Sequence, residues 1–223
     1  AHYLIHSYDY PPIAEQGLRA ARRYAGIAPS ASHALHMPGH IFTRRGLWDE
    51  SIETNLRSAA AAQSHFDSLH ALDYLEYAYL QQARDGDAKG VRDRINAITK
   101  VSPEHFVTAY ALAAIPSRYA LERGRWADAA KVSPQPAERE VAWEKFPQAV
   151  AVMVYARALG AARSGDAPSV RKGIDKLQSL RKDMIEAKIP YWPQQADIQI
   201  RIASAWAAFA EGNRQEALKL MRE

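Results

Sequence analysis

Apolar and polar residues recur along this chain with the period of an α-helix, and no stretch flanked by turns alternates between the two as a half-buried strand does. A short turn that contains glycine separates each longer helical stretch from the next. The turns are centred on Gly46, Gly86, Gly124, Gly165 and Gly212, which lie 40, 38, 41 and 47 residues apart. This spacing predicts an all-α fold of repeated helix–turn–helix units.

Each unit has a first helix, rich in alanine and tyrosine, and a second helix after the turn. The expected first helices cover residues 30–44, 69–84, 104–123, 148–164 and 194–211. The expected second helices cover residues 49–62, 89–99, 127–131, 169–187 and 215–222. Each glycine should end a first helix with a positive φ. Pro38 and Pro116 fall inside first helices, where each removes a backbone hydrogen bond and predicts a kink.

Residues 132–146 interrupt this rhythm with two prolines, and they are expected to form a loop and a short helix. The chain starts without methionine and ends in a helical pattern, so it is expected to be a fragment of a longer chain. Residues 1–223 are expected to form one α-helical repeat domain.

The turn sequences resemble those of a known superfamily. Arg45-Gly46-Leu47-Trp48 and Arg123-Gly124-Arg125-Trp126 share a glycine after a helix and a tryptophan two residues later. This pattern resembles the tetratricopeptide repeat superfamily, whose units have about 34 residues. The resemblance implies a right-handed superhelix of about five helix–turn–helix units, with the first helices on its concave face and with extended helices or loops.

Three segments that carry histidine, residues 2–9, 36–44 and 70–81, are more specifically similar to a poorly characterised group of longer bacterial repeat proteins. Those proteins generally carry an export signal and further repeats upstream. The resemblance therefore implies an exported or periplasmic protein, and it supplies no activity.

Composition narrows the function classes. The 223 residues are 48% hydrophobic and 24% charged, as in an ordinary globular chain. The absence of cysteine excludes disulfides, thiolate metal sites and thiol nucleophiles. The net charge of +4 is spread among both signs, and no apolar run approaches the length of a membrane span. We therefore expect neither nucleic-acid binding nor a membrane span.

Histidine is the residue type with the clearest chemical pattern. His2 and His6 are four residues apart, as are His36 and His40, and His70 begins the helix after next. If the helices that carry them are neighbours, the five imidazoles converge, and such nitrogen ligands suit zinc, copper or nickel. Asp9 and Asp73 would serve as ligands or as acceptors that orient an imidazole.

Two other interpretations of these histidines stay open: hydrogen-bonded residues of the core, or a general base. As metal ligands, His36 and His40 are expected to be exposed. His33, which shares a helix face with them at i, i+3 and i+7, is assigned with His65 and His105 to solvent-side or cap positions.

Polar and aromatic residues on the first helices suit an inner groove. The predicted groove residues are Asp73, Tyr77, Gln81, Tyr110, Ser117 and Arg118. The first function predicted is therefore a binding scaffold that receives a protein segment or a small ligand, and the alternative is a metal-binding protein that uses the histidine cluster. The same residues also suit helix-to-helix contacts. The sequence shows no phosphate loop, serine-nucleophile elbow or paired-carboxylate signature, so an enzyme is unsupported.

Overall fold

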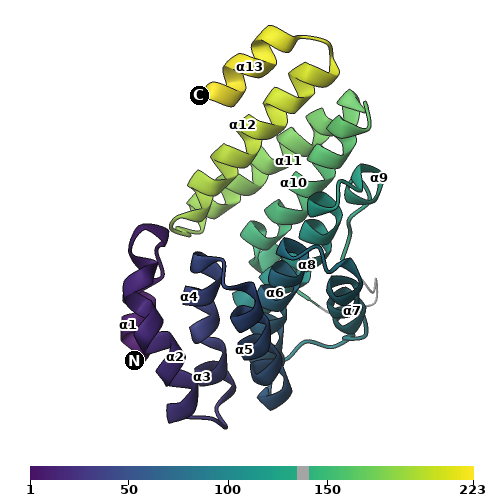
Figure 1. Cartoon of the computed structure of the whole chain (residues 1–223). Helices are drawn as coiled ribbons and strands as arrows, with labels where there is room; N and C mark the ends of the chain where they lie inside the picture. The colour runs from purple at the N-terminus through teal and green to yellow at the C-terminus, as the bar shows by residue number, and fades with distance from the viewer. Residues whose placement is uncertain (135–140) are drawn as a thin grey trace. The chain divides into compact units, whose positions relative to one another are not determined.

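Helices are the only regular elements in the residues that the structure, a computed structural model, describes, which are 1–134 and 141–223 (Figure 1). The all-α class expected from the sequence is confirmed. The helices divide into two compact units, which are described separately below. One is Ala1–Ile115, and the other contains residues 116–134 and Val141–Glu223. The single repeat domain over residues 1–223 stays a prediction.

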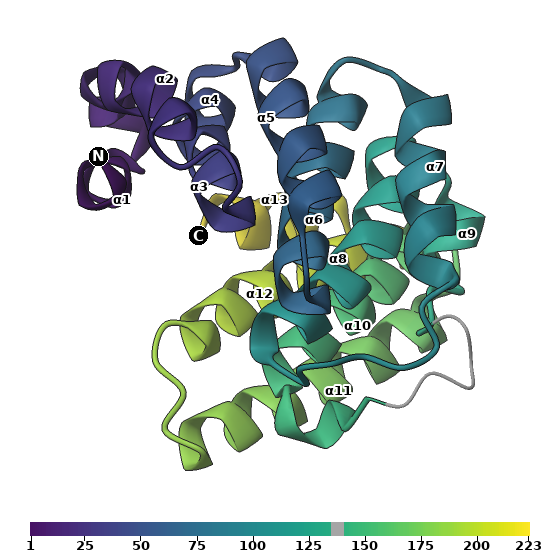
Figure 2. The ribbon, with the colours of Figure 1, turned by 90° about the horizontal axis from the view of Figure 1, so that it is seen from below.

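The first unit contains the histidine segments. Its helices are α1 (His2–Tyr8), η1 (Pro11–Gly17), α2 (Leu18–Ile27), α3 (Ser32–His36), α4 (Pro38–Arg45), α5 (Trp48–Ala61), α6 (His65–Gln81) and α7 (Asp85–Asn96). Helix α5 packs against α3 and α4 and also against α6, which packs against α7 (Figures 1 and 2). Ile5, Met37 and Ile41 are fully buried in a core shared by α1, α2 and α4. This packing places α1, the α3–α4 pair and α6 around one region.

The second unit contains α9 (Trp126–Ala129), η2 (Trp143–Lys145), α10 (Pro147–Arg163), α11 (Ala167–Glu186), α12 (Trp192–Ala210) and α13 (Arg214–Arg222). Helix α8 (Phe106–Glu122) runs from the first unit into this one. Buried alanines, among them Ala158, Ala162 and Ala203, let α10, α11 and α12 approach closely. Of the loop and short helix expected over 132–146, η2 accounts for the helix, while residues 135–140 lie outside the described residues.

The turns between paired helices share one geometry. Gly46, Gly124, Gly165 and Gly212 have φ between 61° and 85°, as expected. After Gly46, the N–H of Leu47 donates to the carbonyl of Phe42 at 2.9 Å, which satisfies one of the free carbonyls at the end of α4.

The prediction for Gly86 is wrong. Gly86 lies in the first turn of α7, and Ala83, with φ 54°, ends the preceding helix instead. The N–H of Arg84 donates to the carbonyl of Tyr79 at 2.8 Å, so the turn has the same hydrogen bond without glycine. Helix α7 therefore begins four residues before the expected start, with Asp85 and Asp87 in its first turn, where acidic residues complement the helix dipole.

Pro38 alters the helix expected over residues 30–44 more than a kink would. Residues 30–44 form two helices, because Pro38 is the first residue of α4 and α3 ends at His36. Pro116 lies within the continuous helix α8, which begins at Phe106 rather than at residue 104. No described helix is both long and apolar enough to cross a bilayer.

Candidate metal centre

Six histidines of the first unit form two groups of three. The inner triad is His36, His40 and His70, from α3, α4 and α6, and the outer triad is His2, His6 and His33, from α1 and α3. Within each triad, one ligand nitrogen from each histidine lies within 4.8 Å of the other two. The five histidines expected to converge are divided between these groups, with His36, His40 and His70 in the inner triad and His2 and His6 in the outer triad. Whether either triad binds metal stays a prediction.

The tautomer of His36 is set by Asn55 of α5. The amide nitrogen of Asn55 donates to the carbonyl oxygen of Ser51 at 2.7 Å, so the amide oxygen faces His36. That oxygen is 2.7 Å from Nδ1 of His36, which therefore carries the proton and donates it. In the neutral ring, Nε2 of His36 is left with a free lone pair.

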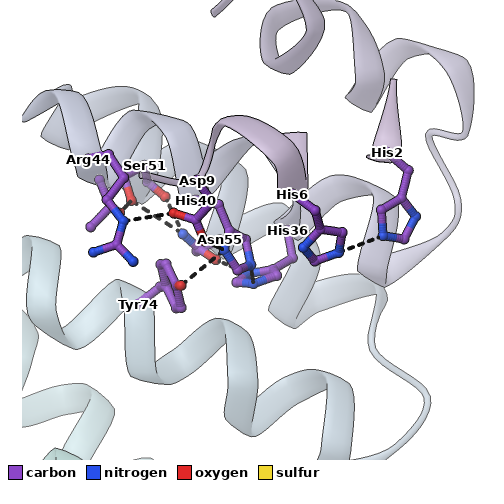
Figure 3. A network of polar contacts seen from close by, with 10 residues as sticks. His2, His6, Asp9, His36, His40, Arg44, Ser51, Asn55 and Tyr74 are labelled. Atoms are coloured by element: carbon purple, nitrogen blue, oxygen red, sulfur yellow. Dashed lines mark hydrogen bonds and ion pairs between the residues drawn. The ribbon is translucent and has the colours of Figure 1, made fainter. Parts of the chain in front are cut away.

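Asp9 sets the tautomer of His40 in the same way. Its Oδ2 is 2.8 Å from Nδ1 of His40, and its Oδ1 accepts a hydrogen bond from Nε of Arg44 at 2.7 Å (Figure 3). The hydrogen bonds from His40 and Arg44 outweigh burial and lower the pKa of Asp9 to about 2. A carboxylate at this position fixes a proton on Nδ1 of His40. In the neutral ring, Nε2 of His40 then carries a free lone pair, as Nε2 of His36 does. Asp9 thus orients an imidazole, one of the two roles expected for it.

The two Nε2 atoms of His36 and His40 lie 3.1 Å apart. Two lone pairs at that distance repel each other unless a cation lies between them, either a proton or a metal ion. Two imidazole nitrogens on one tetrahedral zinc are separated by about 3.3 Å, given bonds of about 2.0–2.1 Å. The separation is therefore close to that of a shared metal ion.

Burial favours the neutral form of two histidines of the inner triad, His36 and His70. His36 and His40 are only 2% and 9% exposed, which corrects the expectation that these ligand positions are at the surface. Burial, together with His70 and His40, holds the pKa of His36 well below 6.5. Burial and His40 likewise lower the pKa of His70 to about 4, although the carboxylate of Asp73 acts in the opposite direction. Neutral imidazole is the form that binds metal.

Gly39 explains how Asn55 reaches the histidines. A Cβ atom on Gly39 would lie 2.7 Å from Nδ2 of Asn55, so glycine at this position leaves room for the Asn55 amide where it stands. The Pro38-Gly39 pair between His36 and His40 thus breaks the helix and admits the orienting amide.

Sequence reasoning missed Asn55, although a signal existed. The buried face of α5 carries Ser51, Thr54, Asn55 and Ser58 where a core face is normally apolar. Polar groups on a buried face need partners, and they mark a polar network.

Tyr74 lies next to the inner triad, one helical turn after His70 on α6. Its hydroxyl oxygen is 3.1 Å from Nδ1 of His40, and its ring meets that of His36 edge to face at 4.9 Å. Burial raises the pKa of Tyr74, so the hydroxyl stays protonated. Sequence reasoning also missed this residue, whose spacing of four from His70 places both on one helix face.

The outer triad is more exposed. Nε2 of His2 and Nε2 of His6 are 2.9 Å apart (Figure 3). Nδ1 of His2 is 3.5 Å from the hydroxyl of Tyr24. Burial is the main cause that lowers the pKa values of His6 and His33. His33 is exposed, as expected, but its place in a triad was missed, although its i, i+3, i+7 spacing with His36 and His40 was the available signal.

The remaining histidines lie outside both triads. Nδ1 of His65 accepts a hydrogen bond from the backbone N–H of Ser102, and His105 packs edge to face on Phe66. These positions fit the expected cap and solvent-side roles.

The predicted groove residues are divided between the two units. Asp73, Tyr77 and Gln81 lie on α6, and Tyr110, Ser117 and Arg118 lie on α8, the last two in the second unit. Asp73 and Ser117 are buried, Gln81 is exposed, and Tyr77 packs edge to face on Trp48. A groove formed by these residues stays a prediction.

Comparison with known proteins gives no further guide, because no protein-family model, no curated protein and no solved structure matches this chain. The geometry of the histidines is therefore what supports a function.

Proposed function

We propose that this chain is a metal-binding protein whose inner triad, His36, His40 and His70, holds a divalent transition ion such as zinc, copper or nickel. Three imidazole nitrogen ligands suit each of these ions, and the lack of cysteine removes the thiolate alternative. A set of three protein ligands leaves a further coordination position for water or another ligand.

The observation that carries the proposal is the paired orientation of His36 and His40. Each ring donates its Nδ1 proton to a fixed acceptor, and the two Nε2 atoms then face each other at 3.1 Å. Histidines that bind metal characteristically donate their other N–H to a carboxylate or carbonyl group, as these two do to Asp9 and Asn55. His70 adds a third nitrogen within 4.8 Å.

A proton between the two Nε2 atoms is the competing arrangement. It requires one ring to be an imidazolium, and a buried cation is costly. Asp9 offsets part of that cost for His40 because its carboxylate lies 2.8 Å from Nδ1. The two arrangements differ in how the protein responds to added metal, which makes them separable by experiment.

The test is a calorimetric titration of the untagged, metal-free chain with Zn²⁺, Cu²⁺ and Ni²⁺ at neutral pH, together with ¹⁵N spectra of the imidazoles. We expect saturable binding, and we expect the Nε2 resonances of His36 and His40 to shift when metal is added. Because both residues are buried, replacing both with alanine lowers stability as well as binding. The variant His70→Ala, which leaves the 3.1 Å pair intact, is therefore the second measurement and should weaken binding.

The matched control is His65→Ala/His105→Ala, which removes two histidines of the same unit that lie outside both triads. It should bind metal as the unaltered chain does. The proposal fails if none of the three ions binds and the spectra show a protonated ring shared between His36 and His40.

We also propose, as a finer description of the fold, a right-handed superhelix of tetratricopeptide-like units. The recurrence of one left-handed turn at Gly46, Ala83, Gly124, Gly165 and Gly212 supports it. Its test is a crystal structure in which each helix pair is related to the next by a right-handed rotation.

The scaffold function predicted from the sequence is kept as a second proposal, because Tyr77 and Gln81 place an aromatic and an exposed polar side chain on one face of α6. Extended peptides on an array should bind the chain, and Tyr77→Ala/Gln81→Ala should reduce that binding. Equal binding by both chains would contradict this proposal.

A further inference from the structure

The outer triad differs from the inner triad in how its rings are held. In the outer triad, Nε2 of His2 and Nε2 of His6 face each other. Among the described residues, the only other hydrogen-bond contact of these three rings is the long one, 3.5 Å, between Nδ1 of His2 and the hydroxyl of Tyr24. The inner triad has the carboxylate of Asp9 and the amide of Asn55 at 2.7–2.8 Å. Loss of such orienting partners typically weakens metal affinity about 10–100-fold.

The two triads are also close to each other along two routes. The ring centroids of His6 and His40 are 5.8 Å apart, and those of His33 and His36 are 6.3 Å apart. Each route joins one exposed histidine of the outer triad to one buried histidine of the inner triad. An ion in the outer triad thus lies one ring away from the inner ligands.

We propose that the outer triad is a second, weaker metal site that captures the ion from solution and passes it to the inner triad. This inference rests on the proposed function of the inner triad. The cargo is a divalent transition ion that accepts imidazole nitrogen. The chain is then a carrier that acquires metal through an exposed, labile site and retains it in a buried, oriented one.

The transfer is a series of ligand exchanges. In each step, one metal–nitrogen bond to an outer histidine breaks as a metal–nitrogen bond to an inner histidine forms. Imidazole binds metal in its neutral form at both triads, so each exchange replaces one neutral ligand with another and needs no electron or co-reactant.

The exchange has a kinetic consequence. An ion held in the outer triad is presented to the inner triad at an effective concentration in about the millimolar range. At micromolar free metal, the outer triad should therefore accelerate loading of the inner triad.

The test uses the full chain with Zn²⁺ for stoichiometry and Co²⁺, whose visible absorption reports its coordination, for stopped-flow loading. The unaltered chain should bind two ions, with dissociation constants that differ about 10–100-fold. The variant His2→Ala/His6→Ala should bind one ion at the tighter constant. Its inner site should fill about ten-fold or more slowly at micromolar Co²⁺. The control His65→Ala/His105→Ala should behave as the unaltered chain.

The outcomes separate this inference from the proposed function. If the unaltered chain binds one ion, and only His70→Ala weakens it, the outer site does not exist, although the inner site stands. If two ions bind but His2→Ala/His6→Ala loads at the unaltered rate, transfer from the outer site is excluded. If no ion binds, both proposals fall.

Discussion

The proton positions on His36 and His40 are fixed by side chains that lie far away in the sequence. Asn55 is on α5 and Asp9 lies between α1 and η1, yet each contacts Nδ1 of its histidine directly. A pair of histidines four residues apart is common on helices. The acceptors behind both rings distinguish this pair, because they turn both Nε2 lone pairs toward the same point.

Removing the acceptor behind His40 tests this orienting role. Asp9→Ala should weaken Zn²⁺ binding about 10–100-fold, because Nδ1 of His40 loses its partner and the ring its fixed direction. Asp9→Asn keeps an oxygen acceptor and should lose less. Titration calorimetry measures both, and Asp93→Ala, which removes an exposed carboxylate of α7 paired with Lys89, is the control. Equal affinity in Asp9→Ala and the unaltered chain would show that Asp9 does not orient the ligand.

The neutral histidines predict how the metal-free chain responds to acid. Burial lowers the pKa of His70 from 6.5 to about 4, so below pH 6.5 the unfolded chain takes up protons that the folded chain does not. Stability is therefore fully present above pH 6.5 and falls as the pH drops toward 4. His70 alone accounts for at most about 3 kcal/mol of that loss.

Urea unfolding with a chelator present, at intervals between pH 7.5 and pH 4.5, measures this effect. The variant His70→Gln has no imidazole to protonate at this position, so its stability should vary less over that range. A free energy of unfolding that is constant between pH 7 and pH 5 would contradict the prediction.

At the scale of the element, the residue with a left-handed backbone conformation after α6 is an alanine, where glycine is favoured. Ala83 has φ 54°, while four other helices end on glycine with a similar φ. A residue with a Cβ atom is disfavoured there by roughly 1 kcal/mol. Ala83→Gly should therefore stabilise the chain by about 0.5–1 kcal/mol.

The reverse exchange at Gly46 is its control. A Cβ atom on Gly46 meets nothing closer than 3.9 Å, so Gly46→Ala changes only the backbone preference and should destabilise by about the same amount. Urea unfolding of both variants gives the two signs. A lower free energy of unfolding in Ala83→Gly would show that the positive φ of Ala83 does not limit the stability of the chain.

The helices themselves were predictable because apolar periodicity and glycine spacing are local signals. The failures came where packing overrides them. Gly86 has the position of a turn residue in the sequence, but Ala83 and Arg84 make the turn. The five expected histidines could be grouped from their spacing, whereas Asn55 and Tyr74 belong to the site through contacts between helices, which no local pattern encodes.

At the scale of the whole molecule, all six histidines of the triads belong to the unit Ala1–Ile115. A change in the core of the other unit should therefore alter stability and leave metal affinity unchanged. Gly160 of α10 is such a position, because its Cβ atom would lie 2.2 Å from the backbone nitrogen of Ala130.

Gly160→Ala should destabilise the chain by about 1–3 kcal/mol, because the backbone beside α9 has to shift. The dissociation constant for Zn²⁺ should stay that of the unaltered chain. Thermal unfolding and calorimetry measure the two quantities. Gly90→Ala, in α7 with nothing within 4 Å of the new Cβ atom, is the control and should not destabilise. A parallel loss of stability and affinity would mean that the metal site depends on the second unit.

Two ligands of the inner triad, His40 on α4 and His70 on α6, lie on helices that are separated in the sequence. An ion bound to both His40 and His70 is a cross-link that closes a loop of about 30 residues, and restricting an unfolded chain to that extent is worth roughly 3–4 kcal/mol. The chain has no cysteine with which to make such a link covalently. Bound metal would then serve as a reversible substitute for a disulfide, present when the ion is supplied and removed when a stronger chelator takes it.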